Sequence, residues 1–433
     1  MFFLRRNKTM KFSFSVLAAS LLSLTYGYIP INNKVKIGFE TWEETFSSPD
    51  FNKDTKYALI VNPTSVTRNL QLIADNLVES KKINLVALAG PEHGIRGSLQ
   101  DGVTVGNLSF VDRVTGLQVY DGYLYTKGSQ WSAAFNDMGA DTIVFDIQDV
   151  GTRFYTYISA MYDAMIGAVL SNKKFIVLDR PNPINGVTVD GDVMVPQFSG
   201  YIGRTAIATQ HGMTVGELAM LFNNEFLPND AQLANSQVKT VDLQVFKMEG
   251  WKREMYYDET GLNWIIPSPN MPSLETAGVY PGQGFFEGTK LSEGRGSSYP
   301  FFAFAADYLQ GKNLAKLQKA MNDLNLPGVV FSQIYFKPAR SKYINVQSGG
   351  LKLYVTDRST YKSIPTAIAL LSTIKKMFPS NFEYASTLAL QYRTGTNSIY
   401  EMLNSDADYQ DIIAEYQSRL EQFKVMRAKY LLY

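Results

Sequence analysis

Short, almost uninterrupted apolar runs alternate with segments of helical periodicity through the first half of this 433-residue chain. The apolar runs have the length and β-branched content of buried strands, and they lie at 57–61, 83–88, 142–147 and 174–178. Between them, apolar residues recur at helical intervals over 69–79, 130–138 and 155–170. Strands that are apolar throughout must be covered on both faces, and parallel strands need helical crossovers. The pattern therefore predicts an α/β fold built on a mainly parallel sheet.

Polar motifs follow the predicted strands at the point where each strand ends. They are Asn62-Pro-Thr-Ser65, Pro91-Glu-His-Gly94, Asp146-Ile-Gln-Asp-Val-Gly-Thr-Arg153 and Asp179-Arg-Pro-Asn-Pro183. The carboxyl ends of parallel strands meet at one edge of a sheet, and ligands bind in the crevice beyond that edge. We therefore expect these four motifs, which are distant in sequence, to converge in space.

The texture of the sequence changes near residue 262. Turn-rich segments at 266–272 and 282–296 lead into a second α/β region, with helices predicted over 313–323 and 364–378 and strands over 329–336 and 351–355. The stretch 409–432 is helical and amphipathic, which is typical of a docking or packing element. We assign residues 29–262 to an N-terminal domain and 263–433 to a smaller α/β domain that completes a cleft.

Residues 1–28 have the composition of an export signal. Basic residues precede a short apolar run at 12–24, and small, turn-forming residues follow it. The run is short for a membrane span, which favours a cleaved signal peptide over an uncleaved anchor. Cysteine is absent, so a disulfide framework, a lipid-bearing thiol and thiolate chemistry are excluded. We expect an exported protein, periplasmic or extracellular, with no membrane span after removal of the signal.

The composition argues against several classes of partner. The chain has 41 Lys and Arg against 40 Asp and Glu, and a net charge of +1 does not indicate the excess of basic residues typical of proteins that bind nucleic acid. The two histidines stand in separate motifs and cannot supply a histidine-rich zinc site, so no metal is expected. The glycines at 282, 284 and 288 do not open a helix after a strand as a dinucleotide fingerprint does, so no cofactor is expected.

The loop around the first histidine is the strongest pointer to function. A predicted strand ends abruptly in Glu92, His93 and Arg96, held between glycines, and such a loop gives up stability to bring polar groups close to a ligand. A carboxylate placed just past a buried strand suits a general acid. The structural alternative is that Glu92 pairs with Arg96 and caps backbone amides. His93 then orients the loop through a hydrogen bond.

Two aspartates flank the end of the third predicted strand. Asp146 and Asp149 need not face the same space, and one of them positions a substrate hydroxyl while the other caps a helix. Asp149 fits the capping role, with a helix beginning near Thr152. Arg153 either contacts an anionic substituent of the ligand or forms an ion pair with Asp149.

Three further segments offer candidates. Asp179 and Arg180 precede a stiff, proline-rich exit from the fourth strand, at the expected edge of the site. Thr214-Val-Gly-Glu217 has the pattern of a capping box, which makes Glu217 structural and leaves His211 as a possible ligand contact. The glycine-rich loop at 282–296 supplies Glu287, Glu293 and Arg295, so either glutamate could partner Glu92.

These motifs together resemble the NamZ-type exo-β-N-acetylmuramidases, formerly a domain of unknown function. The resemblance also includes His211-Gly-Met-Thr-Val-Gly-Glu-Leu218, Pro267-Ser-Pro-Asn-Met-Pro272 and Glu287-Gly-Thr-Lys-Leu-Ser-Glu-Gly-Arg-Gly296. It spans most of the chain but carries little after about residue 340. One local departure is Gly296-Ser-Ser-Tyr-Pro300, where the family pattern has Gly-Thr-Thr, although a hydroxyl survives at both positions.

The resemblance implies a Rossmann-like N-terminal domain joined to a smaller C-terminal domain, with the active site between them. It also implies a secreted glycoside hydrolase that removes N-acetylmuramic acid (MurNAc) from the non-reducing end of peptidoglycan fragments such as MurNAc–GlcNAc. The glutamate of its Pro-Glu-His-Gly motif, here Glu92, is marked as catalytic. The lactyl carboxylate of MurNAc would suit Arg96, Arg153 or Arg295, and Tyr155 or Tyr157 could form a platform for the sugar ring.

We therefore predict a glycosidase in which Glu92 protonates the leaving oxygen and Asp146 or Glu293 supplies the second catalytic group. The residues predicted to bind the substrate are Asn62, His93, Arg96, Asp149, Arg153, Tyr157, Asp179, Arg180, His211, Asn270 and Arg295. A retaining nucleophile, an inverting water and the substrate's own acetamido group all remain open as the second role. The rival functions are a non-catalytic exported protein that binds cell-wall fragments and, suggested by the sheet alone, a nucleotide-dependent oxidoreductase.

Overall fold

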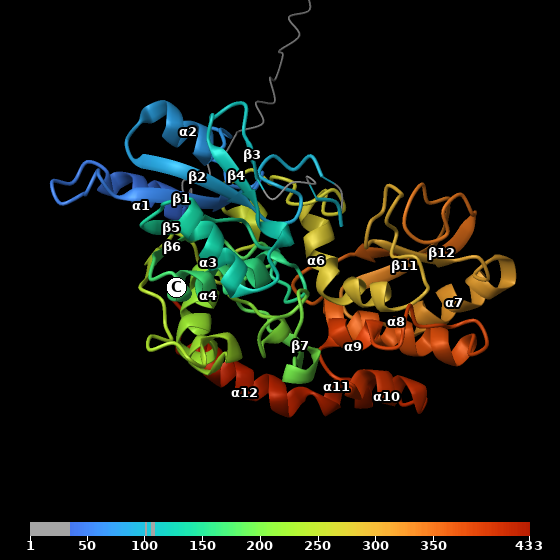
Figure 1. Cartoon of the computed structure of the whole chain (residues 1–433). Helices are drawn as coiled ribbons and strands as arrows, with labels where there is room; N and C mark the ends of the chain where they lie inside the picture. The colour runs from blue at the N-terminus through green and yellow to red at the C-terminus, as the bar shows by residue number, and fades with distance from the viewer. Residues whose placement is uncertain (1–34, 100–101, 105–108) are drawn as a thin grey trace, which may run out of the picture. The chain divides into compact units, whose positions relative to one another are not determined.

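A sheet with a parallel centre organises the first half of the chain in the computed structural model, which describes residues 35–99, 102–104 and 109–433 (Figure 1). The strands are β1 (Lys56–Val61), β2 (Asn84–Gly90), β3 (Ser109–Val111), β4 (Gln118–Asp121), β5 (Thr142–Asp146), β6 (Lys174–Leu178) and β9 (Leu243–Phe246). Their spatial order is β3-β4-β2-β1-β5-β6-β9. The pairs are parallel except for β3, which runs antiparallel to β4 at one edge. The predicted fold class is confirmed.

Both faces of this sheet are covered, as the apolar strands require. Alternate residues of β1 face opposite cores: Ala58 and Ile60 pack in one cluster, and Leu59 and Val61 in the other. The first cluster lies under α3 (Gly128–Asp137), α4 (Tyr157–Leu170) and α5 (Val215–Leu221), and the second under α1 (Gly38–Thr45) and α2 (Ile73–Ser80). Loops at the carboxyl ends of the strands are thereby fixed from both sides.

A second, smaller sheet lies in the C-terminal half. Its strands β10 (Ala303–Ala306), β11 (Val329–Phe336) and β12 (Ser348–Val355) are antiparallel in the order β10-β12-β11. Helix α7 (Gly311–Asp323) packs on it, and α8 (Ser363–Met377) packs against α7 and α6 (Leu274–Gln283). The remaining elements are the paired strands β7 (Asp190–Val193) and β8 (Ala208–Gln210), and helices α9 (Ala389–Thr394), α10 (Ser398–Asn404), α11 (Tyr409–Glu415) and α12 (Gln417–Ala428).

The terminal stretch 409–432 is helical over most of its length, as predicted, in two helices: α11 ends at Glu415 and α12 begins at Gln417. One local prediction is wrong. No helix begins near Thr152: Thr152 forms an isolated β-bridge with Gln210, and α4 begins five residues later at Tyr157. Asp149 therefore does not cap that helix.

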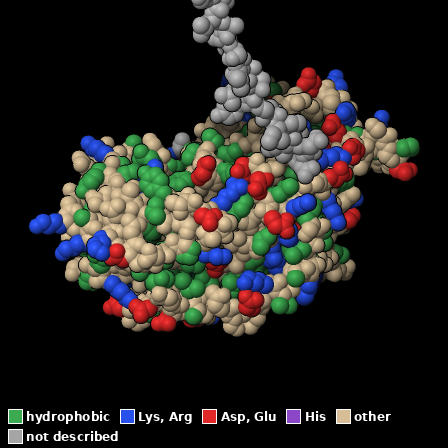
Figure 2. All heavy atoms as spheres, turned by 180° about the vertical axis from the view of Figure 1, so that it is seen from behind, with side chains coloured by type: hydrophobic (Ala, Val, Ile, Leu, Met, Phe, Trp, Pro, Cys, Tyr) green, Lys and Arg blue, Asp and Glu red, His purple; other side chains and the backbone are tan. Residues whose placement is uncertain are grey.

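The described residues from Val35 onward cluster as one compact unit, so the domain boundary near residue 262 stays a prediction. The predicted export signal at 1–28 lies outside the described residues. Within the described part of the chain, we find no helix that is both long and apolar enough to cross a membrane. On the face shown in Figure 2, acidic and basic side chains are interspersed, in keeping with the net charge of +1.

Candidate functional site

The loops after β1, β5 and β6 meet at the carboxyl edge of the large sheet, as predicted. Ser65 Oγ donates to the carbonyl oxygen of Asp146, and Thr64 Oγ1 accepts a hydrogen bond of 2.9 Å from the backbone amide of Gln148. Arg180 forms an ion pair with Asp146 and also donates to the carbonyl of Val66 at 3.2 Å. These contacts are buried, so they make a rigid frame rather than an open site.

A cavity of about 260 Å³ lies beside this frame. Its wall draws on segments that are far apart in the sequence: the loop after β2, the residues leading into α4, the segment around α6, the loop at 287–301 and helix α9. The residues that line it are Glu92, His93, Gly102, Phe154, Tyr155, Thr156, Tyr157, Ile202, Ser268, Asn270, Met271, Tyr280, Glu287, Arg295, Phe301 and Arg393. The two halves of the chain thus complete one site, and five residues predicted from the sequence lie in it: Glu92, His93, Tyr157, Asn270 and Arg295.

Glu92 presents its carboxyl group to this cavity. Its Oε2 accepts a hydrogen bond of 2.9 Å from Thr156 Oγ1, and its Oε1 accepts one of 3.3 Å from the backbone amide of Gly102. Thr156 is the N-cap residue of α4, so the carboxyl group lies near the positive end of that helix. The alternative pairing with Arg96 is wrong, because the Arg96 guanidinium binds Asp75 and Asp112, each at 2.8 Å.

The backbone next to Glu92 is strained. His93 has φ +73°, in the left-handed region that side chains other than glycine rarely adopt. Its Nδ1 donates to the carbonyl of Leu99 at 2.9 Å, which leaves Nε2 as the acceptor of the neutral ring. Phe301, on the opposite part of the wall, also has a positive φ of 61°. Strain of this kind persists where function needs the geometry.

A cluster of charges occupies another part of the wall. The part-buried Glu287 forms ion pairs with Arg295 and with Arg393, the latter at 3.0 Å from Nε. Burial acts to raise the pKa of Glu287, but the two guanidinium groups outweigh it and lower that pKa. Arg295 also lies over the ring of Phe301, 5.3 Å from the centroid. The cluster therefore presents two fixed cations and one ionised carboxylate to the cavity.

Three tyrosines form the aromatic part of the wall together with Phe154 and Phe301. Tyr155 packs edge-on against Tyr157 and Tyr280, with ring centroids 5.0 and 5.8 Å apart. Burial raises the pKa of all three hydroxyl groups, so they stay protonated. The hydroxyl of Tyr157 donates to the carbonyl of Pro267 at 2.5 Å. The ring positions are thus fixed by packing and hydrogen bonding before any ligand enters.

The other predicted residues at the sheet edge are held inside the frame and do not line this cavity. His211 Nδ1 accepts from the backbone amide of Met213, so Nε2 donates to Asp149, 3.2 Å away. Asp179 accepts hydrogen bonds from Thr214, Gly216 and Tyr433. The capping box of Thr214 and Glu217 is confirmed.

Five more predicted residues are also engaged elsewhere. Asn62 Oδ1 accepts from the backbone amide and the hydroxyl of Thr64. The buried Arg153 guanidinium donates to three backbone carbonyls, and it has no ion pair with Asp149. Glu293 accepts from Lys342 Nζ at 2.8 Å and from Ser341 at 3.1 Å. Asp146 and Arg180 form a buried ion pair with each other. The catalytic and binding roles predicted for these residues stay predictions.

Sequence reasoning missed Thr156, Tyr280 and Arg393. Thr156 lies inside a quoted motif, but it becomes visible as a partner of Glu92 only when α4 is known to begin at Tyr157. Arg393 comes from the C-terminal region, where the family resemblance is weak, and no local pattern marks it. Its last-turn position on the short helix α9 is the only sequence signal, and a basic residue there is common.

Comparison with known proteins places this architecture in a family. The models of the N-terminal and C-terminal parts of the exo-β-N-acetylmuramidase NamZ match residues 57–275 and 278–433. The peptidoglycan β-N-acetylmuramidase NamZ of Bacillus subtilis (strain 168) is 40% identical over 403 residues, which cover 92% of each chain.

Two crystal structures of DUF1343 family proteins from Bacteroides fragilis NCTC 9343 have the same fold. One has a TM-score of 0.81 at 32% identity, covering 93% of this chain and 99% of the other. The second has a TM-score of 0.71 at 26% identity, covering 92% and 99%. With both parts of the family model matched in order and a relative at 40% identity, the chain belongs to the exo-β-N-acetylmuramidase NamZ family.

Proposed function

We propose that the protein is an exo-acting glycoside hydrolase that releases N-acetylmuramic acid from the non-reducing end of peptidoglycan fragments such as MurNAc–GlcNAc. The observation that carries the proposal is the position of Glu92 in a cavity that fixed cations and tyrosine rings also line. The Bacillus subtilis relative is a peptidoglycan β-N-acetylmuramidase, which supports the same substrate class. The alternative of a non-catalytic protein that binds cell-wall fragments predicts binding without turnover.

Glu92 acts as the general acid that protonates the leaving glycosidic oxygen. Its surroundings differ from those of Glu287, the other carboxyl group in the cavity wall. Thr156 and a backbone amide hold Glu92, whereas two guanidinium groups keep Glu287 ionised. Unequal surroundings are how a pair of carboxyl groups divides the roles of acid and anion.

Arg295 and Arg393 bind the lactyl carboxylate of the MurNAc ring, and Glu287 holds both guanidinium groups in position. An export signal at residues 1–28, if present, would deliver the enzyme to the cell wall or the medium. Glu287 is ionised, but the two guanidinium groups compensate its charge, so its carboxylate makes a poor nucleophile. The substrate's acetamido group therefore fits the second role better than a carboxylate of this cavity.

The test is hydrolysis of MurNAc–GlcNAc by Glu92→Gln. Loss of general acid catalysis lowers kcat by about 10²–10⁴-fold while the fold is kept. Release of N-acetylmuramic acid is followed by chromatography, and folding by circular dichroism. The matched control is Glu254→Gln, an exposed glutamate outside this cavity, which keeps wild-type turnover. Undiminished activity of Glu92→Gln would remove Glu92 from the mechanism, and absence of turnover in the wild type would favour the binding protein.

A further inference from the structure

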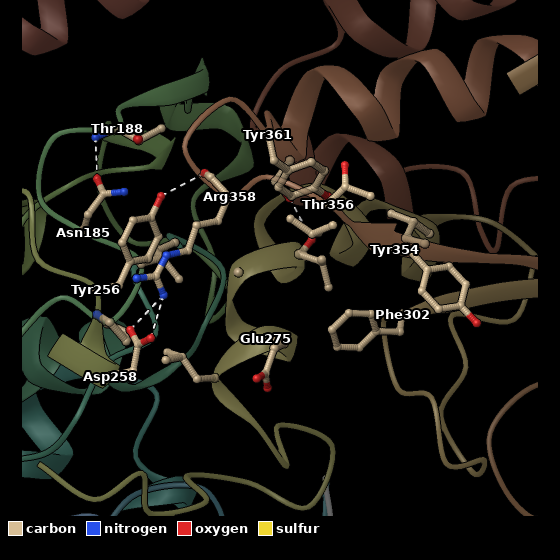
Figure 3. A pocket seen from close by; sticks show the side chains of 18 of the residues that line it. Asn185, Thr188, Tyr256, Asp258, Glu275, Phe302, Tyr354, Thr356, Arg358 and Tyr361 are labelled. Atoms are coloured by element: carbon tan, nitrogen blue, oxygen red, sulfur yellow. Dashed lines mark hydrogen bonds and ion pairs between the residues drawn. The ribbon is translucent and has the colours of Figure 1, made fainter. Parts of the chain in front are cut away.

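A second cavity, a groove of about 580 Å³, lies on the other side of helix α6 from the site of Glu92. Leu274, Glu275 and Gly278 of α6 line the groove, whereas Tyr280 of the same helix lines the first cavity. Figure 3 shows Asn185, Tyr256 and Asp258 on one side of the groove and Phe302 and Tyr354 on the other. The volume is that of a pocket for a small ligand. Nothing in the mechanism proposed above uses it.

One border of the groove is the edge of strand β12. The consecutive residues 352–356 all line it, and because side chains alternate along a strand, the backbone itself must face the space. The neighbouring strand β10 begins opposite Lys352, and the amide of Leu353 donates to the carbonyl of Phe302 at 2.9 Å. By alternation, the N–H and C=O of Val355 point the same way, past the start of β10. Among the described residues neither group has a backbone partner on that side.

On the wall provided by α6, no side chain projects at Gly278, and the fold does not explain why. This glycine lies inside a helix and does not have a positive φ, so the backbone does not require it. A Cβ built there would meet nothing within 4 Å, so close packing does not require it either. A glycine in a helix interior costs about 0.8–1.0 kcal/mol relative to alanine. The lack of a side chain leaves room for the main chain of a ligand to lie against α6.

Cations cover two of the aromatic rings of the groove. Lys352 Nζ lies over the ring of Tyr354, 4.6 Å from its centroid, and the Arg358 guanidinium lies over Tyr256 at 4.2 Å. Arg358 and Asp258 pair with each other, whereas Lys352 and Glu275 have no ion pair within the described residues, so the groove presents one unpaired charge of each sign. Free main-chain groups together with both charges suit a peptide that carries carboxylates and an amino group.

We propose that this groove binds the peptide stem of peptidoglycan fragments, carried by a MurNAc unit further along the glycan than the one released, in extended form along the free edge of β12 at Val355. The proposal rests on the function proposed above, because it assigns the groove to the peptide part of the same class of substrate. One peptide unit of the stem pairs with the N–H and C=O of Val355. Lys352 binds a carboxylate of the stem, and Glu275 binds its amino group.

The experiment titrates the full-length protein with the free tetrapeptide stem L-Ala-γ-D-Glu-diaminopimelate-D-Ala, using calorimetry. The wild type binds the peptide. Gly278→Leu fills the groove and weakens binding at least tenfold, whereas the matched control Gly278→Ala stays within threefold. Both variants hydrolyse peptide-free MurNAc–GlcNAc at the wild-type rate, and Gly278→Ala raises Tm because the helix gains propensity.

Three results would overturn the proposal. They are no peptide binding by the wild type, unchanged peptide binding by Gly278→Leu, and loss of affinity for a peptide-free glycan in Gly278→Leu, which would assign the groove to sugars. If Gly278→Leu does not fold, Lys352→Gln decides, with an expected loss of fivefold or more in peptide affinity. Failure of the proposed hydrolase function would appear separately, as absence of MurNAc–GlcNAc turnover in a wild type that binds the peptide.

Discussion

At the scale of single residues, charge partners decide which polar groups remain available for chemistry. Asp146, Asp149 and Glu293 all lie near the predicted site, yet each is held by a cation or a histidine inside the fold. Among the described residues, a hydroxyl and a backbone amide hold Glu92, which borders open space. Position at the sheet edge is therefore necessary for a role in catalysis but does not by itself assign one.

Arg393 should act mainly in substrate binding. A charge-assisted hydrogen bond contributes about 1.5–3 kcal/mol, so Arg393→Met should raise KM for MurNAc–GlcNAc by roughly 10–150-fold, with a smaller change in kcat. Steady-state kinetics measure the two parameters separately. Arg393→Lys keeps the charge, so its KM should lie between those of Arg393→Met and the wild type. An equal KM for GlcNAc–GlcNAc in all three proteins is expected, because that disaccharide has no lactyl group.

Asp179 should make stability depend on pH. Burial raises its pKa to about 7, against about 3.9 in the unfolded chain. The stability that protonated Asp179 contributes to the folded state is therefore fully present below about pH 4 and is lost as the pH rises toward 7. Asp179→Asn removes the ionisation, so the Tm of the wild type should fall relative to this variant between pH 4 and pH 8. A constant difference in Tm over that range would show that Asp179 does not titrate there.

At the scale of elements, the residue pattern fixes strands better than helix starts. The strands at 174–178 and 329–336 were predicted to the residue, because β-branched and apolar runs end there in turn or charged residues. The start of α4 was misplaced because Gly151, with φ +82°, and the bridge from Thr152 to Gln210 hold the chain out of the helix. That bridge is a long-range pairing, which no local window reveals.

Thr214 links the start of α5 to the sheet. Its Oγ1 accepts from the backbone amide of Glu217 and donates to Asp179 at 2.8 Å. Thr214→Ala should lower the free energy of unfolding by about 1–2 kcal/mol, the usual cost of losing an N-cap. Urea denaturation measures the change. Thr214→Ser keeps the hydroxyl and should lie within about 0.5 kcal/mol of the wild type.

At the scale of the whole molecule, the sequence predicted the carboxyl-edge location of the site and a later loop that completes it, but not every residue of its wall. Glu92 and His93 could be placed because they follow a recognisable strand, β2. Glu287 and Arg295 could be placed on the glycine-rich loop at 282–296. Tyr280 and Arg393 reach the same cavity through the packing of α6 and α9, which depends on contacts between distant segments that a single sequence does not reveal.

The N-terminal half should not fold alone. The buried Arg153 guanidinium needs the carbonyl of Arg393, 240 residues later, as one of its acceptors. A fragment of residues 35–275 leaves this charged group short of a partner, which is costly in a core. Circular dichroism and limited proteolysis should show a loosely structured fragment, in contrast to the full chain with its single cooperative transition. A protease-resistant fragment with a sharp transition would contradict this expectation.

The same contact of Arg153 sets an order of events during biosynthesis. While the ribosome is still making the chain, the pocket of Arg153 stays open until α9 has been made and docked. We therefore expect the half-made chain to stay loosely packed for most of its synthesis. Such a delay would hold back the closing of the cavity around Glu92 until synthesis is nearly complete.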